Sequence, residues 1–393
     1  MMKKQITKRI LSFVTVLFLV AATITGCGKS SDSDKETGSN EVTGTEDANA
    51  DETEDTDGKD PADSLKSTET TSNKAAVKIG FVKGSLCVAP IHLAYLNGYF
   101  EQEFAAANIK WSYEEVDLNQ AAELLAAGKI NACFGLTASL IKPIDNGLDI
   151  AFTTGLHTGC TKYYVKEDSD INSVSDLKGK TIGVPGLADS STMNLKRKLL
   201  EVGIGASTDN MEVTFAEYAL TDLPLALDNG AVDAVALHDP VAYQAEEEYS
   251  FKKILDTGTD EKFQGEYCCQ SYVSSGLAKD NPKGAAAYTR ALQKAAAFIQ
   301  ADPQEAAKIQ LDNEFCSGDL ETNAKLLESY NYAPSVSAGL ATFTSAVKEL
   351  QQIGDLSADV NAEDFISKHF VKLEGVPNSI SYNKDTKEFT ESK

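Results

Sequence analysis

The sequence predicts an α/β protein with two parallel-sheet lobes and a ligand cleft between them. Its 393 residues are too many for one small core, which favours two domains. Strand-like and helix-like segments alternate in two successive stretches of the chain, and this order is typical of parallel sheets with right-handed crossovers. One short sequence motif, which we call the repeated phrase, also occurs twice and aligns on a glycine: LAAGKINACFGLTA at 125–138 and LDNGAVDAVALHDP at 227–240.

Residues 1–26 are predicted to be a secretory signal peptide. Four basic residues among the first nine precede an apolar run at 10–24, which is too short for an ordinary membrane span. The tetrad Ile24-Thr25-Gly26-Cys27 resembles a bacterial lipobox. This resemblance implies that Cys27 is diacylated and becomes the mature N-terminus, and two acyl chains suffice for stable anchoring. An uncleaved anchor with an incidental cysteine is the alternative.

After the lipidated Cys27, the chain continues to residue 74 as an acidic linker. Segment 28–74 contains fourteen acidic residues, five lysines and no aromatic residue, so it cannot bury enough apolar surface to fold. We expect a disordered, charge-extended tether, whose length favours a Gram-positive type of surface over a periplasm. The whole chain has a formal net charge of -23, and such an acidic surface argues against nucleic acid as a partner.

The first lobe is expected to begin with a strand, a helix and a second strand, at 75–82, 89–109 and 109–116. A second helix at 119–130 and a third strand at 131–136 follow. Gly98 and Gly128 are expected to end helices, because glycine readily adopts the left-handed conformation found there.

The second lobe repeats this order. Strands are expected at 180–186, 211–218 and 232–237, with helices at 189–203 and 223–230. Each copy of the repeated phrase is then the step from a helix end into a strand, and the end of that strand carries a loop to the ligand. Alternatively, both copies are common α/β sequence without a shared role.

Two longer segments carry a family resemblance. YYVKEDSDINSVSDLKGKTIGVPG (163–186) resembles the crossover into the second lobe of type II solute-binding proteins, and 274–309 is similar to the return. With the repeated phrase, they resemble the nitrate/taurine/aliphatic-sulfonate branch of ABC-importer binding proteins, which includes thiamine-pyrimidine binders. The resemblance covers nearly all of 77–375. It implies a type II periplasmic-binding-protein fold with two hinge crossovers, divided into lobe 1 (75–170 and 275–385), lobe 2 (171–274) and a tail (386–393).

The same resemblance places several loops at the cleft. The candidate ligand-binding residues follow predicted strands: Ser85, Leu86, Cys87, Thr137, Ala138, His157, Ser190, Ser191, Thr192, Tyr218, His238 and Asp239. Ser190, Ser191 and Thr192 start a helix, where free N–H groups and the helix dipole favour an anion or a polar group. Asp189 or Ser190 is also expected to cap this helix. His157 and His238 are either ligand contacts or satisfied structural groups.

The residue types at these loops restrict the ligand. None of the loops contains arginine, which is the usual clamp for a carboxylate or sulfonate, so a ligand with apolar and polar parts fits at least as well. Besides Cys27 there are six cysteines, Cys87, Cys133, Cys160, Cys268, Cys269 and Cys316, which are either free or paired. His157 and Cys160 near Cys87 could bind a soft metal, but the paired ligand spacings of zinc sites are missing, and we expect no metal.

These features predict an extracytoplasmic, lipid-anchored solute-binding protein of an ABC importer. It would capture a small organic or anionic solute by lobe closure and deliver it to a membrane permease with a cytoplasmic ATPase. We expect a monomer without cofactor or catalytic residues. The alternative is an exported enzyme on the same fold, related to thiamine-pyrimidine synthases. Against it, the chain has YCCQS (267–271) instead of their fuller cysteine-rich run, and no catalytic motif appears.

Overall fold

A computed structural model describes residues 76–82, 86–117 and 120–393. The predicted signal peptide, Cys27 and the linker lie outside these residues, and so does Ser85. The described residues belong to one compact unit, Pro61–Lys393. None of their helices combines the length and the apolar character that crossing a bilayer requires.

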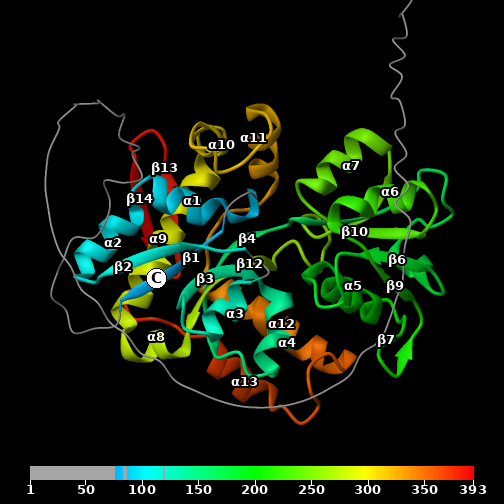
Figure 1. The fold of residues 1–393 in the computed structure, drawn as a ribbon, viewed down its shortest axis with the longest axis horizontal. Coiled ribbons are helices and arrows are strands. Elements are labelled where there is room, and N and C mark those ends of the chain that lie inside the picture. Colours follow the sequence, from blue (N-terminus) through cyan, green and yellow to red (C-terminus); the bar gives the residue numbers. More distant parts are fainter. Residues whose placement is uncertain (1–75, 83–85, 118–119) are drawn as a thin grey trace, which may run out of the picture. The chain divides into compact units, whose positions relative to one another are not determined.

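The first sheet has five strands in the order β2-β1-β3-β12-β4 (Figure 1). These are β1 (Val77–Phe81), β2 (Trp111–Glu115), β3 (Ala132–Leu136), β4 (Ile150–Thr158) and β12 (Tyr267–Ser274). The helices between the first four strands are α1 (Ala89–Leu96), α2 (Tyr99–Ala107), α3 (Ala121–Ala126) and α4 (Thr137–Asp145). β1 is parallel to β2 and β3, whereas β12 is antiparallel to both of its neighbours. The predicted elements are confirmed, and one antiparallel strand joins the expected parallel sheet.

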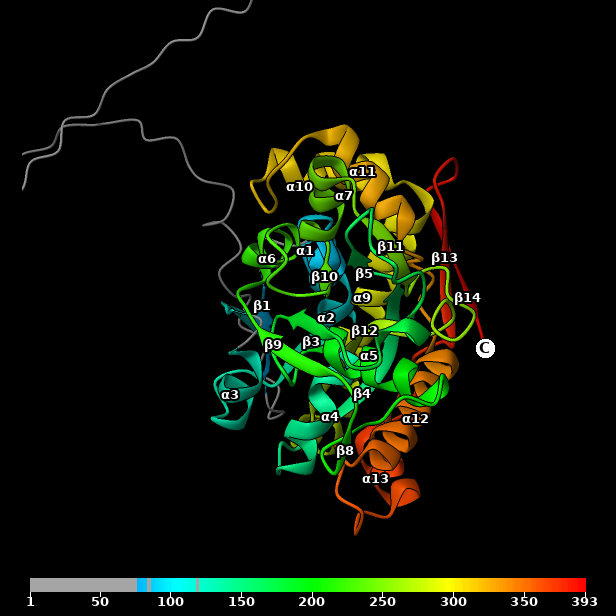
Figure 2. The same cartoon turned by 90° about the vertical axis from the view of Figure 1, so that its right-hand side faces the viewer.

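The second sheet also has five strands, in the order β11-β5-β10-β6-β9. Figure 1 labels β10, β6 and β9, and Figure 2 labels β11 and β5. These are β5 (Thr161–Val165), β6 (Thr181–Val184), β9 (Thr214–Glu217), β10 (Ala234–His238) and β11 (Lys252–Asp256). Its helices are α5 (Ser190–Glu201), α6 (Leu223–Asp228) and α7 (Val241–Tyr249), and a short hairpin is formed by β7 (Ala206–Ser207) and β8 (Asn210–Met211). β6 is parallel to β9 and β10, whereas β5 is antiparallel to β10 and β11.

The repeated phrase occupies equivalent places in the two lobes. Gly128 and Gly230 follow α3 and α6 with φ of 67° and 70°, so each supplies the left-handed residue at a helix end. The next strands, β3 and β10, are the middle strands of the two sheets. Asn131 and Asp233 accept a backbone N–H from β1 and β6 at 2.7 and 2.8 Å. The phrase therefore fixes β1 beside β3 in the first lobe and β6 beside β10 in the second.

The chain changes sheets at positions that differ from the expected boundaries. The first crossover is Gly159-Cys160, between β4 and β5, and the return is 257–266, between β11 and β12. The sequence predicts these changes later, at 170/171 and 274/275. The difference arises because β5 and β12 each enter a sheet antiparallel to the neighbouring strands, which alternation of strand and helix does not predict.

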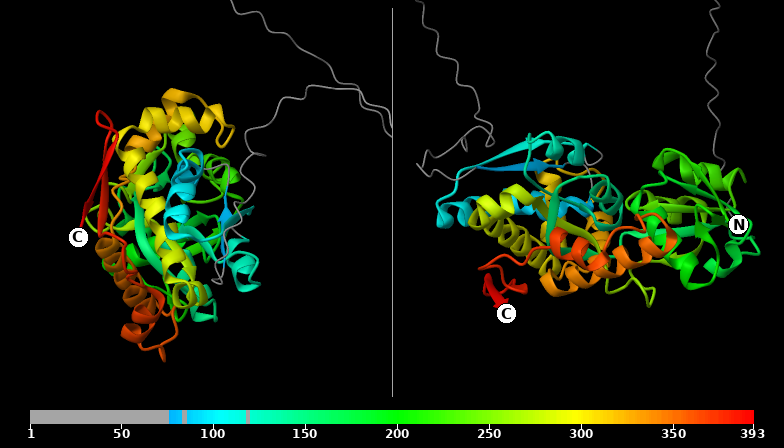
Figure 3. Two further views of the ribbon diagram at one scale, coloured as in Figure 1. Left: turned by 90° about the vertical axis from the view of Figure 1, so that its left-hand side faces the viewer. Right: turned by 90° about the horizontal axis from the view of Figure 1, so that it is seen from below.

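The C-terminal part of the chain covers the first sheet with helices. These are α8 (Ser275–Asp280), α9 (Pro282–Ala301), α10 (Pro303–Asp312), α11 (Leu320–Ser329), α12 (Val336–Ile353) and α13 (Ala362–His369). α9 packs against α1 and α2, and α12 packs against β4 and reaches α5 of the second lobe (Figure 3). The expected tail is partly ordered, because β14 (Glu388–Ser392) pairs with β13 (Ser379–Asn383) as a hairpin.

Candidate functional site

A cavity of about 550 Å³, which we call the cleft, is lined by residues of both lobes. On the side of the first lobe, Leu136, Ser139 and Leu140 come from the end of β3 and from α4. On the other side are the loop 185–189 after β6 and Glu217 at the end of β9. The carboxyl ends of three strands thus meet at the cleft, which is the position where open α/β sheets bind ligands.

The start of α5 reaches the cleft through Asp189. The side chain of Asp189 caps the helix, because its Oδ1 accepts the backbone N–H and the hydroxyl of Ser191 at 2.8 and 2.6 Å. Thr192 donates its hydroxyl to the carbonyl of Gly186 at 2.7 Å. The hydroxyl of Ser190 is buried and has no hydrogen-bond partner. Of the three predicted hydroxyls, only that of Ser190 is therefore unengaged.

His238 completes the surroundings of this carboxylate. Its Nε2 lies 2.7 Å from Oδ1 of Asp189, and its Nδ1 lies 3.1 Å from the hydroxyl of Thr161. Burial alone would raise the pKa of Asp189, but the charge and hydrogen bond of His238 lower it to about 2. Burial likewise opposes the charged form of His238, yet Asp189 raises its pKa well above the usual value. The two side chains therefore form an ion pair at neutral pH.

Asp239 lies next to this pair and has its ion pair and a backbone hydrogen bond within the second lobe. Its carboxylate is buried, 3.2 Å from Nζ of Lys162, and accepts the backbone N–H of Tyr243 at 3.0 Å. Burial raises the pKa of Asp239, while Lys162 acts in the opposite direction. This pair joins the end of β10 to β5, which is a structural role.

His157, at the end of β4, is fully buried between two tyrosines. Its ring lies 5.5 Å from that of Tyr330 and 5.0 Å from that of Tyr332. Nδ1 faces the carbonyl of Thr158 at 3.2 Å, while Nε2 has no hydrogen-bond partner, and neither has the hydroxyl of Tyr330. Burial lowers the pKa of His157 to about 4, so the imidazole is neutral. Neither tyrosine is among the residues predicted from the sequence, although Tyr-Asn-Tyr (330–332) shows the alternation typical of a half-buried extended segment.

Leu86 and Cys87 form a short 3-10 helix (Leu86–Val88) in the core of the first lobe. Both side chains are buried, and the carbonyl of Leu86 accepts the hydroxyl of Tyr332 at 2.8 Å. This helix is thereby joined to the tyrosines beside His157. Among the described residues, no three His, Cys, Asp or Glu side chains are arranged to hold a metal ion.

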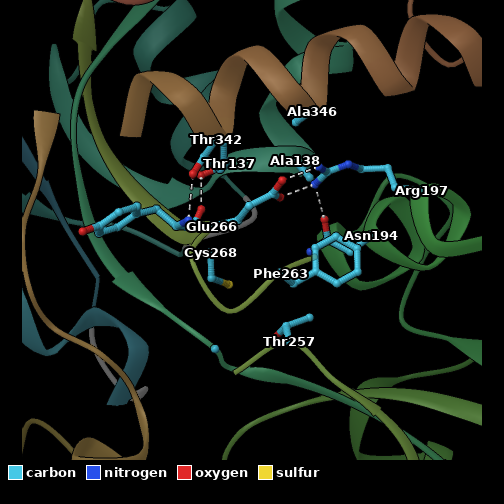
Figure 4. A pocket seen from close by; sticks show the side chains of 12 residues that line it. Thr137, Ala138, Asn194, Arg197, Thr257, Phe263, Glu266, Cys268, Thr342 and Ala346 are labelled. Carbon is cyan, nitrogen blue, oxygen red and sulfur yellow. Dashed lines mark hydrogen bonds and ion pairs between the residues drawn. The ribbon is translucent and has the colours of Figure 1, made fainter. Parts of the chain in front are cut away.

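Thr137 and Ala138 line a second, much smaller cavity of about 20 Å³ beside the crossovers (Figure 4). Thr137 donates its hydroxyl to the carbonyl of Tyr267 at 2.9 Å. Arg197 of α5 lies at the same cavity and binds Glu266 through two nitrogens, at 2.7 and 2.8 Å. Its Nε also binds Glu349 of α12, at 2.6 Å. Arg197 thus joins the second lobe to the return crossover and to the first lobe.

Arg197 is absent from the residues predicted from the sequence, because it lies in the middle of α5 and not in a loop after a strand. Its charge is balanced by two carboxylates, so it is engaged within the protein. Tyr218 packs against the core of the second lobe, whereas its neighbour Glu217 lines the cleft. The remaining histidines have structural partners: His92 binds Gln310 and the carbonyl of Val82, and His369 binds the carbonyl of Ile150.

The chain is similar to known proteins over most of its length. A family model described as NMT1/THI5 like matches residues 87–306, which is more than half of the 393 residues. The riboflavin-binding protein RibY of Chloroflexus aurantiacus is 23% identical over 297 residues, covering 72% of this chain and 82% of RibY.

The solved structures that share the fold include two periplasmic binding proteins. The aliphatic sulphonate binding protein SsuA of Escherichia coli has a TM-score of 0.61 at 20% identity, covering 76% of this chain and 94% of SsuA. The nitrate-binding protein NrtA of Synechocystis PCC 6803 has a TM-score of 0.59 at 14% identity, covering 81% and 96%. These likenesses confirm the two-lobed fold and the resemblance found in the sequence. The chain belongs to the NMT1/THI5-like family and has the fold of periplasmic binding proteins.

Proposed function

We propose that this protein is the solute-binding component of an ABC importer. In this proposal, Cys27 carries a lipid anchor, segment 28–74 is a tether, and the folded part works outside the cytoplasm on a Gram-positive type of surface. The two lobes close on a small organic or anionic solute and deliver it to a permease served by a cytoplasmic ATPase. The observation that carries the proposal is the cleft, to which both lobes contribute strand ends and at which Asp189 presents a carboxylate.

The charges near the cleft favour a solute with little negative charge. Asp189 and Glu217 line the cleft, and two cations of the same lobe are already paired: His238 with Asp189, Lys162 with Asp239. Arg197 is bound by two glutamates. A sulfonate or nitrate ion would therefore meet no unpaired cation among these side chains. Leu136 and Leu140 offer apolar surface beside these polar groups, which suits an organic solute that donates hydrogen bonds.

An enzyme is the second candidate, because a family named NMT1/THI5 like is associated with thiamine-pyrimidine synthesis as well as with binding. The observation that favours it is the presence of several thiols near His157 and His238 at the crossovers. The two candidates differ in the fate of the solute. A binding protein releases it unchanged on unfolding, whereas an enzyme releases a product, and mass spectrometry of the released molecule distinguishes these outcomes.

The binding function is tested by a thermal-shift screen with alkanesulfonates, nitrate, pyrimidines, riboflavin and amino acids. A ligand of the folded state at a hundred times its Kd adds about 2.7 kcal/mol to the free energy of unfolding, which raises the melting midpoint measurably. We expect an organic solute to produce this shift and nitrate to produce none. If no compound in the panel raises the midpoint, the proposed solute class is wrong.

Calorimetric titration of the bound compound then tests the cleft. Asp189→Asn keeps a capping side chain but removes the charge, and we expect affinity to fall about tenfold or more, since a hydrogen bond to a charged group contributes roughly 1.5–3 kcal/mol. The matched control is Asp319→Asn, because Asp319 caps α11 by accepting the N–H of Thr322 at 2.9 Å and does not line the cleft. Equal affinities in both variants would show that the solute binds elsewhere.

The anchor has a separate test. Cys27→Ser should move the protein from the membrane fraction to the soluble fraction, because Cys27 is the proposed site of acylation. The conservative change Thr25→Ser leaves the cysteine in place and should leave the protein on the membrane. Retention of Cys27→Ser on the membrane would contradict lipid anchoring without affecting the proposed binding function.

A further inference from the structure

Four of the six described cysteines gather where the chain passes between the lobes. We call them the thiol cluster: Cys87, Cys160, Cys268 and Cys269. The other two lie apart, since Cys133 belongs to β3 and Cys316 to the loop between α10 and α11. All six are thiols in this structure. The proposed solute binding gives these thiols no role.

Within the thiol cluster, Cys160 and Cys268 are in direct contact. Their Sγ atoms lie 2.7 Å apart, which is about 0.7 Å longer than a disulfide bond of roughly 2.05 Å. Cys160 belongs to the first crossover, Gly159-Cys160, and Cys268 lies just after the return crossover, at the start of β12. The pair therefore joins the two places where the backbone passes from one lobe to the other.

We propose that Cys160 and Cys268 are an oxidation site at which a hydroperoxide converts the two thiols into a disulfide that ties the two crossovers together. Cys268 is the thiol that reacts first. Its side chain is partly exposed and lines the small cavity beside Arg197, whereas Cys160 is fully buried. Figure 4 shows Cys268 at the cavity that Phe263 and Thr257 also line. A cavity of about 20 Å³ admits a molecule of about the size of water, and hydrogen peroxide is among the few oxidants small enough to approach there.

The hydrogen bonds around Cys268 support this order of reaction. The hydrogen bonds from Cys160 and Cys269 lower the pKa of Cys268 to about 6, against the opposing effect of burial. The pKa values of Cys87 and Cys269 are raised well above the usual value, first by their hydrogen bonds with Cys160. Cys268 is therefore deprotonated more readily than Cys87 and Cys269, and the thiolate is the nucleophilic form of cysteine.

The chemistry balances with hydrogen peroxide as the oxidant. The Cys268 thiolate attacks one peroxide oxygen, the O–O bond breaks, and hydroxide leaves, which makes Cys268 a sulfenic acid. Sγ of Cys160 then attacks the sulfenic sulfur, the S–O bond breaks, and water leaves with the proton of Cys160. The hydroxide takes up the proton that Cys268 had released. Two thiols thus lose two electrons, which reduce the peroxide to two water molecules.

A disulfide between Cys160 and Cys268 would close a loop, because the two residues are 108 positions apart. The segment between them contains every strand of the second sheet. Closing such a loop restricts the unfolded chain, so the oxidised protein should melt at a higher temperature than the reduced protein. It would also hold the two crossovers at a fixed separation while the lobes move. This inference does not depend on the identity of the solute or on the lipid anchor.

The test begins with the reduced, purified protein. It is treated with hydrogen peroxide, its remaining thiols are alkylated, and it is digested at acid pH and analysed by mass spectrometry without reduction. We expect a linked pair of peptides that carry Cys160 and Cys268. The link should disappear in Cys160→Ser and in Cys268→Ser, and it should remain in Cys269→Ser and in the control Cys316→Ser. In Cys160→Ser, dimedone should trap a sulfenic acid on Cys268.

The wild-type protein alone gives a second measurement, which does not depend on how the variants fold. Before oxidation, iodoacetamide at neutral pH should alkylate Cys268 faster than Cys316, which is also partly exposed but whose pKa is raised by burial. A dominant link between Cys87 and Cys160, or between Cys268 and Cys269, would overturn the proposal. So would oxidation of Cys316 while Cys268 stays reduced. Equal melting midpoints with the bridge in place would show that it does not tie the crossovers.

Discussion

Nε2 of His238 lies 2.7 Å from Oδ1 of Asp189, and this contact joins the end of β10 to the first turn of α5 at the cleft. The carboxylate thereby accepts hydrogen bonds from the imidazole and from both the backbone and the hydroxyl of Ser191 through a single oxygen. A helix N-terminus attracts negative charge, and here the protein supplies that charge itself. A solute that binds at this helix must therefore interact with a carboxylate rather than with a vacant anion site.

The ion pair predicts how stability depends on alkaline pH. The pKa of His238 is raised on folding. The stability that its charged form adds is therefore fully present below the pKa of the unfolded chain, near 6.5, and is lost as pH rises through the pKa of the folded protein. Melting midpoints measured from pH 6.5 upward should fall for the wild-type protein, and His238→Gln should remove part of this fall. Lys162, Asp239 and Cys160 lie close to His238 and are unchanged in the variant. Parallel curves for the two proteins would contradict a charged His238.

His157 predicts the opposite dependence, on the acid side. Burial lowers its pKa to about 4, so the unfolded chain binds a proton between about pH 6.5 and pH 4 that the folded protein does not bind. Stability should therefore fall as pH decreases through this window, and His157→Gln should reduce the slope there. The same variant should leave the alkaline dependence unchanged, which makes His157→Gln and His238→Gln controls for each other.

Much of the fold could be predicted from the sequence because the repeated phrase combines two strong local signals. A glycine that ends a helix and a following apolar strand identify β3 and β10, the middle strands of both sheets. The crossovers were harder to place. β5 and β12 pair antiparallel with strands far away in the sequence, and no local pattern of TKYYV or YCCQSYVS reports that pairing.

The candidate site could be predicted only in outline. The loop containing Asp189 and the strand end at His238 come together as the resemblance implies, because strand ends define both. The contacts of Arg197 with Glu266 and Glu349 depend on residues 69 and 152 positions away. The stacking of His157 with Tyr330 likewise depends on a distant helix end. Such long-range side-chain contacts follow from the packing of the lobes and leave no periodic signal in the sequence.

Arg197 should contribute strongly to stability. Its guanidinium is only 2% exposed and binds two carboxylates on other segments, so Arg197→Met would remove a counterion from both Glu266 and Glu349. Glu349 would keep its pair with Lys262. Removing one partner of a buried ion pair typically costs about 3–5 kcal/mol of the free energy of unfolding, which denaturant titration measures. The control is Lys308→Met, whose pair with Asp312 is more than half exposed and should matter little. Similar losses in both variants would contradict a special role for Arg197.

Variants that lack the hydroxyls at the start of α5 should distinguish solute binding from helix capping. Ser190 has a buried hydroxyl without a partner, so Ser190→Ala should leave stability nearly unchanged or slightly increased in the absence of solute. If this hydroxyl donates to a neutral acceptor of the solute, affinity should fall roughly twofold to tenfold, because such a hydrogen bond contributes about 0.5–1.5 kcal/mol.

Ser191→Ala with Thr192→Val should have the opposite balance. The hydroxyls of these two residues donate to Asp189 and to the carbonyl of Gly186, so their removal should cost about 1 kcal/mol of stability for each lost bond. The affinity for solute should change much less than in Ser190→Ala, because neither hydroxyl is available unless its bond within the protein breaks. Calorimetric titration beside thermal melts of the three proteins measures both quantities. A large loss of affinity in the double variant with unchanged stability would assign the solute contact to Ser191 and Thr192 instead of Ser190.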